Sequence, residues 1–198
     1  TGDMDLMPDS HDRRGFFREM VRRYVVPAAD YMEEKMDRYT PTSRLVFRPP
    51  GAVAELRFLD ACQRCGKCSQ ACPADAIHHF KNTSERHSGT PYIDPEQQPC
   101  VVCEGLYCMD ACPSGAIQKV NKDQINIGLA KVDLEDCLRS DGENCKECIL
   151  SCPLEEEAIR LNEEGEVIVL DDGCVGCGVC QYSCPSTPKS IVITRNTL

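Results

Sequence analysis

The chain has 198 residues and a formal net charge of −10, with 41% hydrophobic residues, only 6% aromatic residues and no tryptophan. This composition is thin for a large apolar core, and the negative charge disfavours nucleic acid and anionic membrane surfaces as partners. The chain also contains 16 cysteines. Cysteines at this density imply either disulfides in an oxidising compartment or metal ligands in a reducing one, and their spacing decides between the two.

Residues 1–48 contain no cysteine and balance nine Lys or Arg against nine Asp or Glu. Phe17, Met20, Val21 and Tyr24 share one helical face, and Pro27 is suited to the start of a second helix. We therefore expect a helical N-terminal extension over residues 1–48. It either docks onto a partner subunit or folds back over the cysteine-rich residues, and an interfacial membrane helix is a third alternative.

Within this extension, "DRRGFFREMVRRYVVPAADYMEEKMDRY" resembles a twin-arginine export motif. An export signal needs an apolar stretch after the arginines, and here Arg22, Arg23 and Asp30 interrupt it. We therefore expect a cytoplasmic protein, with periplasmic export through this twin-arginine-like start as the alternative. No run in the sequence is apolar and long enough for a transmembrane segment.

The cysteines of residues 49–198 form four groups of four, and every group ends in Cys-Pro. The groups are Cys62, Cys65, Cys68 and Cys72; Cys100, Cys103, Cys108 and Cys112; Cys137, Cys145, Cys148 and Cys152; and Cys174, Cys177, Cys180 and Cys184. The first and fourth have the spacing C-x2-C-x2-C-x3-C-P, and the other two keep this frame with insertions. In this pattern three thiolates hold one iron-sulfur cluster and the fourth reaches a neighbouring cluster.

The spacing thus favours iron-sulfur clusters over disulfides and over structural zinc, because a zinc site needs only two cysteine pairs. We predict four 4Fe-4S clusters, with all sixteen cysteines as ligands. The long insertion between Cys137 and Cys145 leaves a three-iron or differently ligated cluster as an alternative at one site.

Short apolar runs follow each group, and β-branched stretches precede the third and fourth. This repeat predicts an α+β domain over residues 49–198 with four ferredoxin half-units, near 58–80, 92–120, 130–161 and 166–194. The isoleucine that follows each group either packs against a cluster or is an ordinary core residue; these are Ile77, Ile117, Ile159 and Ile191. Two half-units make one two-cluster module. Residue spacing allows sequential pairing of half-units, or nested pairing of the first with the fourth and the second with the third.

The stretches "RPPGAVAELRFLDACQRCGKC", "GTPYIDPEQQPCVVC", "ACPSGAI" and "CLRSDGENCKECILSCP" resemble the MauM/NapG type of ferredoxin, over about residues 48–193. That family is similar to the iron-sulfur subunits of molybdopterin oxidoreductases, in which two modules are nested. The resemblance therefore implies nesting here. The implied ligand sets are Cys62, Cys65, Cys68 and Cys184; Cys100, Cys103, Cys108 and Cys152; Cys137, Cys145, Cys148 and Cys112; and Cys174, Cys177, Cys180 and Cys72.

Other chemistry is weakly indicated: the four histidines form no metal-spaced pair, and no glycine-rich nucleotide loop occurs. We therefore expect an electron-transfer protein that does not catalyse a reaction alone. It would relay single electrons as a subunit of a larger oxidoreductase, beside a molybdopterin, tungstopterin or flavin enzyme. The alternatives are a freely diffusing polyferredoxin and a cluster-stabilised scaffold or assembly protein.

Overall fold

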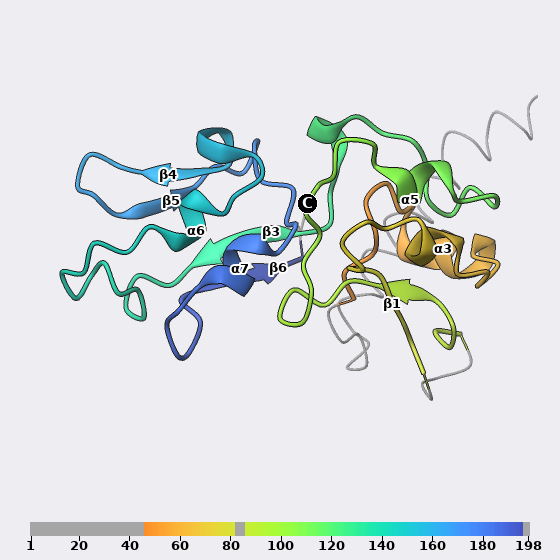
Figure 1. Ribbon diagram of the computed structural model, residues 1–198, viewed down its shortest axis with the longest axis horizontal. Helices are drawn as coiled ribbons and strands as arrows, with labels where there is room; N and C mark the ends of the chain where they lie inside the picture. The colour runs from red at the N-terminus through yellow and green to blue at the C-terminus, as the bar shows by residue number, and fades with distance from the viewer. Residues whose placement is uncertain (1–45, 82–85, 196–198) are drawn as a thin grey trace, which may run out of the picture. The chain divides into compact units, whose positions relative to one another are not determined.

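The computed structural model describes residues 46–81 and 86–195, which belong to one compact unit, Leu45–Leu198 (Figure 1). The extension expected over residues 1–48, with its docking and export alternatives, lies almost entirely outside the described residues. The α-helices are α3 (Glu55–Ala61), α4 (Lys67–Gln70), α5 (Tyr107–Asp110), α6 (Glu147–Leu150) and α7 (Val179–Ser183), and the 3-10 helices are η2 (Lys122–Gln124) and η3 (Glu155–Glu157). The strands are β1 (His78–His79), β2 (Pro91–Tyr92), β3 (Leu129–Val132), β4 (Ile159–Leu161), β5 (Val167–Val169) and β6 (Ile191–Thr194).

The N-terminal half of the described chain, residues 46–120, contains the first two cysteine groups. Between these groups, β1 and β2 pair antiparallel as an inner hairpin. Outside them, Ala52 and Ile117 form an antiparallel bridge that joins the chain before the first group to the chain after the second. Helices α4 and α5, one from each group, pack against each other. The first and second half-units therefore form one module.

The C-terminal half, residues 121–195, repeats this arrangement around the third and fourth groups. Strands β4 and β5 form the inner hairpin, with Ile159 opposite Val169. Strands β3 and β6 form the outer antiparallel pair, with Leu129 opposite Thr194, and α6 packs against α7. The third and fourth half-units therefore form the second module.

The nested pairing implied by the resemblance is thus wrong, because each module is built from half-units that are consecutive in the chain. Nesting would require strands around the first group to pair with strands around the fourth. Instead, the inner hairpin of each module joins two successive groups directly, which keeps the connection short and the contacts local. The mixed α+β architecture with two modules agrees with the sequence analysis.

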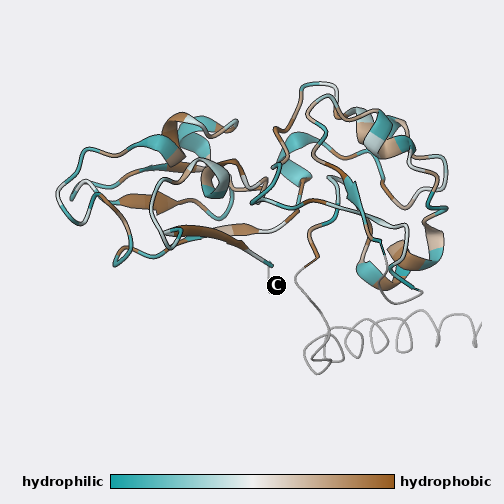
Figure 2. Cartoon of the chain, turned by 60° about the horizontal axis from the view of Figure 1, so that its bottom comes forward, coloured by the Kyte–Doolittle hydropathy of each residue, from teal (hydrophilic) through white to brown (hydrophobic). Residues whose placement is uncertain are grey.

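The core is small and includes many thiols. Phe58 and Ile191 are fully buried or nearly so, and six of the cysteines are also buried, namely Cys68, Cys108, Cys137, Cys177, Cys180 and Cys184. Figure 2 shows that the strands of the second module carry mostly hydrophobic residues while the neighbouring loops are mostly hydrophilic. Thiols therefore occupy positions that apolar side chains take in an ordinary core. Within residues 46–81 and 86–195, no helix has the length and hydropathy of a membrane span.

Candidate iron-sulfur cluster sites

The first cavity is lined by three thiols of the first group and by the last thiol of the second. These are Cys62, Cys65, Cys68 and Cys112. Gly66 has φ +71° and precedes α4, which begins at Lys67 and carries Cys68. That left-handed turn, which suits glycine, lets the backbone curl around the cavity. Ile117 forms part of the wall, and Cys65 is exposed.

The second cavity collects three thiols of the second group and the last thiol of the first, which are Cys72, Cys100, Cys103 and Cys108. The third collects Cys152, Cys174, Cys177 and Cys180. Ile77 lines the second cavity and Ile159 lines the third. Including space that opens to solvent, the three cavities have similar volumes, about 320, 350 and 320 Å³. The same site is therefore built at least three times by the same frame.

The remaining four thiols, Cys137, Cys145, Cys148 and Cys184, also lie together. Burial raises the pKa of Cys148 to about 11, and the negative charges of Cys145, Cys137 and Cys184 add to this effect. Such an influence requires the four groups to be near one another. Every set thus combines three thiols of one group with the last thiol of the other group in the same module. We call these last thiols, Cys72, Cys112, Cys152 and Cys184, the crossing cysteines.

The ligand sets implied by the resemblance are corrected in the same way. The structure brings Cys112 to the first cavity, where Cys184 was expected, and it brings Cys72 to the second, where Cys152 was expected. Cys152 lines the third cavity in place of Cys72. The exchange of the fourth thiol between neighbouring sites occurs as the spacing predicts, but between the two groups of one module.

The chemistry of the cavities fits a 4Fe-4S cluster. Burial raises the pKa of Cys100, Cys108 and Cys177 to about 12 in each case, and neighbouring thiolates add to this effect. Four thiolates in such a cavity need a positively charged centre. Within the described residues, no group of three or more His, Cys, Asp or Glu converges tightly enough for a single metal ion. Thiols spread around a cavity instead suit the corners of a cubane, and all sixteen are free.

Several sulfurs accept hydrogen bonds from the protein. The backbone N–H of Ala76 lies 3.4 Å from Cys72 Sγ, and that of Ala130 lies 3.5 Å from Cys174 Sγ. At Cys184, burial alone would raise the pKa, but hydrogen bonds from Ser186 and Ser190 lower it to about 7. Donors aimed at a ligand sulfur stabilise the more negative form of a cluster.

A buried arginine organises the first module beside the first cysteine group. Arg48 donates from Nε to Glu55 at 2.8 Å and from Nη1 to Thr90 Oγ1 at 3.0 Å. A further bond runs to the carbonyl of Pro91, and the guanidinium lies 4.5 Å from the centroid of the Phe58 ring. Sequence analysis did not single out this residue. In the sequence it is a single arginine before "PPG", and nothing in that pattern indicates its partners some forty residues away.

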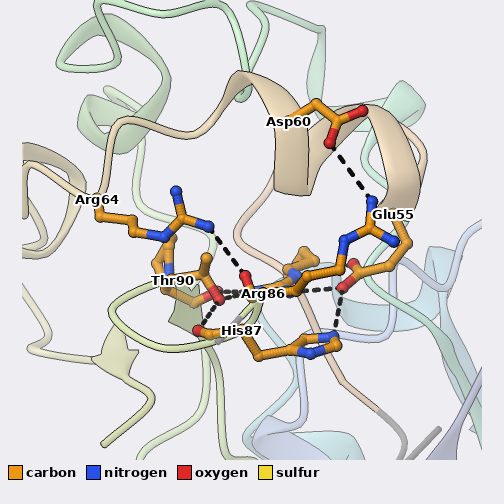
Figure 3. A network of polar contacts seen from close by, with 8 residues as sticks. Glu55, Asp60, Arg64, Arg86, His87 and Thr90 are labelled. Atoms are coloured by element: carbon orange, nitrogen blue, oxygen red, sulfur yellow. Dashed lines mark hydrogen bonds and ion pairs between the residues drawn. The ribbon is translucent and has the colours of Figure 1, made fainter. Parts of the chain in front are cut away.

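Figure 3 shows Arg64 reaching Arg86 and His87 beside Glu55, so that polar contacts connect the first cysteine loop and α3 to residues 86–90. Arg64, which lies inside the loop, donates to the carbonyls of Arg86 at 3.0 Å and Cys62 at 3.2 Å. His87 lies 3.4 Å from Glu55. These contacts fix the loop that carries the thiols of the first site, because the guanidinium of Arg64 bridges two backbone segments.

His78 and His79, which form β1, contact neighbouring residues of the first module. His79 forms part of the wall of the first cavity, but its ring nitrogens face Ser69 Oγ at 2.9 Å and the carbonyl of Gly89 at 3.0 Å. The ring of His78 lies beside that of Tyr92, with centroids 5.7 Å apart. His79 therefore joins α4 to the segment before β2, and His78 packs against β2 within the hairpin.

The four sites follow one another in series. The pKa of Cys108, in the second site, is raised mainly by burial and then by neighbouring thiolates. Cys68 of the first site is one of these neighbours. The backbone N–H of Cys100, in the second site, donates to the carbonyl of Cys177, in the third, at 3.0 Å. The third and fourth sites share the groups that contain Cys152 and Cys184. The series therefore runs through both modules, which meet at the contact between Cys100 and Cys177.

Comparison with known proteins agrees with this geometry. The 4Fe-4S dicluster domain matches residues 61–116, which contain the first two cysteine groups, and residues 142–187, which contain the third and fourth groups except Cys137. The structure thus defines a ferredoxin-type protein with two 4Fe-4S dicluster domains.

Relatives identify the family more closely. The chain is 38% identical to the ferredoxin-type protein NapG of Escherichia coli (strain K12), over 87% of this chain and 80% of that protein. It is 36% identical to the methylamine utilization ferredoxin-type protein MauM of Methylobacillus flagellatus, over 94% and 85%. MauM of Methylophilus methylotrophus is also 36% identical, over 91% and 85%. The chain belongs to the NapG and MauM family of ferredoxin-type proteins.

Proposed function

We propose that this protein is an electron relay that holds four 4Fe-4S clusters in series. The gathering of sixteen thiols into four sets of four carries this proposal. The ligand sets are Cys62, Cys65, Cys68 and Cys112; Cys72, Cys100, Cys103 and Cys108; Cys152, Cys174, Cys177 and Cys180; and Cys137, Cys145, Cys148 and Cys184. When bound, each cluster supplies a one-electron carrier.

The residues of the chain perform three tasks in this relay. The thiolates hold the clusters, and apolar side chains such as Ile77 and Ile159 exclude water from the cavities. Each crossing cysteine belongs to the group of one site and lines the cavity of the other, which keeps the two sites of a module close. The Cys100–Cys177 hydrogen bond holds the two modules at the point where the second and third sites meet.

We further propose that the protein works as the electron-transfer subunit of a larger oxidoreductase. Its relatives are described as ferredoxin-type proteins, and one group is named for methylamine utilization. A relay with sites in series is useful when a donor and an acceptor lie at its two ends. The partner would be a redox subunit that carries a molybdopterin, a tungstopterin or a flavin, and residues 1–48 would contribute to docking.

The cluster content is tested by anaerobic purification of the whole chain and analysis of iron and acid-labile sulfide. We expect about sixteen irons and as many sulfides per chain. About half that amount would contradict the four-cluster proposal.

The partner is tested by affinity purification from the native cells under anaerobic conditions, followed by mass spectrometry. A stoichiometric molybdenum, tungsten or flavin subunit supports the assignment as a subunit. Recovery of the chain alone, with its clusters intact, contradicts it and favours a freely diffusing polyferredoxin.

A further inference from the structure

The crossing cysteine of the fourth site has two hydroxyl groups at its sulfur. Ser186 Oγ lies 3.0 Å and Ser190 Oγ lies 3.3 Å from Cys184 Sγ. All three side chains are buried, with exposed fractions of 7% for Cys184, 7% for Ser186 and 5% for Ser190. A thiolate that ligates iron carries no proton, so both hydroxyls must donate to the sulfur.

The orientation of one of these hydroxyls is set by the backbone. Ser186 Oγ accepts a 2.9 Å hydrogen bond from the N–H of Ser190. With a lone pair of its oxygen occupied in this way, the hydroxyl hydrogen of Ser186 is free to point at Cys184 Sγ. Because the serines follow the Cys-Pro of the fourth group, the loop after Cys184 delivers both donors.

The crossing cysteines of the first module receive longer hydrogen bonds. Cys72 receives the N–H of Ala76 at 3.4 Å. Cys112 receives the N–H of Ile117 at 3.4 Å, while the hydroxyl of Ser114 lies 3.6 Å away. The two contacts at Cys184 are therefore shorter than those at Cys72 and Cys112. The four sites share one thiol frame but differ in this respect.

Reduction places extra negative charge on a cluster and its thiolates, and donors already aimed at a sulfur stabilise that charge. We propose that Ser186 and Ser190 raise the reduction potential of the Cys137, Cys145, Cys148 and Cys184 site, so that electrons are drawn to this end of the series. This inference rests on the proposed function, since it assigns a direction to the relay. It makes the two serines potential-tuning residues, which act through Cys184.

Charged groups near the fourth site raise or lower its reduction potential according to their sign. Lys189 Nζ donates to the carbonyls of Tyr182 and Cys184, which adds a positive charge on the same side as the serines. Glu135 and Asp136 are exposed carboxylates that precede Cys137 and favour the oxidised form. Water and salt screen these carboxylates, whereas the hydroxyls touch the sulfur inside the protein, where the effective dielectric constant is lower. The hydroxyls should therefore dominate.

The test is a redox titration of the whole, cluster-loaded chain, followed by electron paramagnetic resonance (EPR). Ser190→Ala is the cleanest variant, because the Ser190 hydroxyl contacts the sulfur of Cys184, whereas the Ser186 hydroxyl also accepts a backbone hydrogen bond. We expect it to lower the potential of one cluster. In the double variant Ser186→Ala and Ser190→Ala, the equilibrium constant for reduction of that cluster should fall about tenfold, which corresponds to ~59 mV for one electron.

The matched control is Ser151→Ala. Ser151 precedes Cys152, but its hydroxyl donates to the carbonyl of Glu147 at 2.6 Å and not to a sulfur. Iron and sulfide content, measured first, distinguishes the two proposals, since a wild-type chain without a fourth cluster would refute the proposed function itself. With full loading, an unchanged potential in Ser190→Ala, or an equal shift in Ser151→Ala, overturns the inference. Should Ser186→Ala fail to fold, Ser190→Ala decides alone.

Discussion

The backbone N–H of Cys100 lies 3.0 Å from the carbonyl oxygen of Cys177 and donates a hydrogen bond to it. Cys100 lines the second cavity and Cys177 lines the third, so this bond joins the cysteine loops of different modules. Cys100 also contributes to the raised pKa of Cys177, after burial. The two modules thus meet through the thiol-bearing loops themselves, and electrons would cross between modules at this point.

A first prediction concerns that junction. Cys177→Ala should remove the third cluster and interrupt exchange between the first module and the fourth site, because the gap between neighbouring carriers would then widen. Cys145→Ala should remove the end of the series and leave the other three clusters in exchange. Freeze-quench EPR after partial reduction measures this exchange. Equally fast equilibration in both variants would contradict a serial path.

A second prediction tests the pairing of half-units. Cys62→Ala and Cys112→Ala should damage the same cluster, because both thiols line the first cavity. Cys184→Ala and Cys148→Ala should both damage a different cluster, because these two thiols lie in the fourth set. EPR of the reduced variants would show which cluster signal is lost or converted to a three-iron form. If Cys62→Ala matched Cys184→Ala instead, the nested pairing would be restored.

A third prediction concerns Gly176, which lies between two thiols of the third site. Its φ is +67°, and a Cβ atom there would lie 2.2 Å from the backbone of Gly128. Gly176→Ala therefore adds a backbone clash to the strain of a left-handed alanine. We expect the free energy of unfolding to fall at least ~2 kcal/mol further than in the control below.

The matched control is Gly115→Ala. Gly115 has a similar φ of +74° and nothing within 4 Å of the added Cβ, so it isolates the conformational strain. Anaerobic denaturant titration of the loaded proteins compares the two. Equal losses of stability would show that the approach of residues 128 and 176 is not important.

A fourth prediction follows from Glu55. Burial opposes its ionisation, but the hydrogen bond and charge of Arg48 hold its pKa below the ordinary value of 4.5. Folding therefore favours the ionised carboxylate. This stabilisation is present above the unfolded-state pKa and is lost as the pH falls through the lower folded-state pKa.

The measurement compares wild type with Glu55→Gln in anaerobic thermal unfolding from about pH 7 down to about pH 4. We expect the wild type to be more stable near neutral pH, and the difference to shrink at the acidic end. Both proteins carry the same cysteines, so acid damage to the clusters largely cancels in the difference. A difference that stays constant with pH would show that the charge of Glu55 is not involved.

A fifth prediction concerns iron removal. The buried thiols occupy the core, and burial raises the pKa of Cys68 to about 11. Without iron these thiols are separate neutral groups, and the links that a cluster would make between the two cysteine groups of a module are lost. Chelation of iron should unfold residues 46–195, and iron with sulfide should restore them. Circular dichroism and protease digestion follow the change. A protease-resistant apoprotein would indicate that side-chain packing alone suffices.

Much of the site could be read from the sequence because cluster ligation depends on short-range spacing. Three thiols of each group lie on one tight loop, so the local frame around Cys62 or Cys174 already brings them together. The exchange of the crossing cysteine follows from the same frame. The isoleucines after the groups were expected near the clusters or in the core, and Ile77, Ile117 and Ile159 line the cavities.

The pairing of half-units was decided only by tertiary structure. The local frame of a group is satisfied by any neighbouring half-unit, so spacing could not show whether Cys112 or Cys184 completes the first site. Hydrogen bonding between β1 and β2 and between β3 and β6 made that choice. The contacts of Arg48 with Thr90 and Pro91 also depend on how segments some forty residues apart pack after folding. Sequence thus determined the thiol pattern of each group through contacts a few residues apart. The fold determined which sites are neighbours, because the strand pairs β1–β2 and β3–β6 join segments that are distant in the chain.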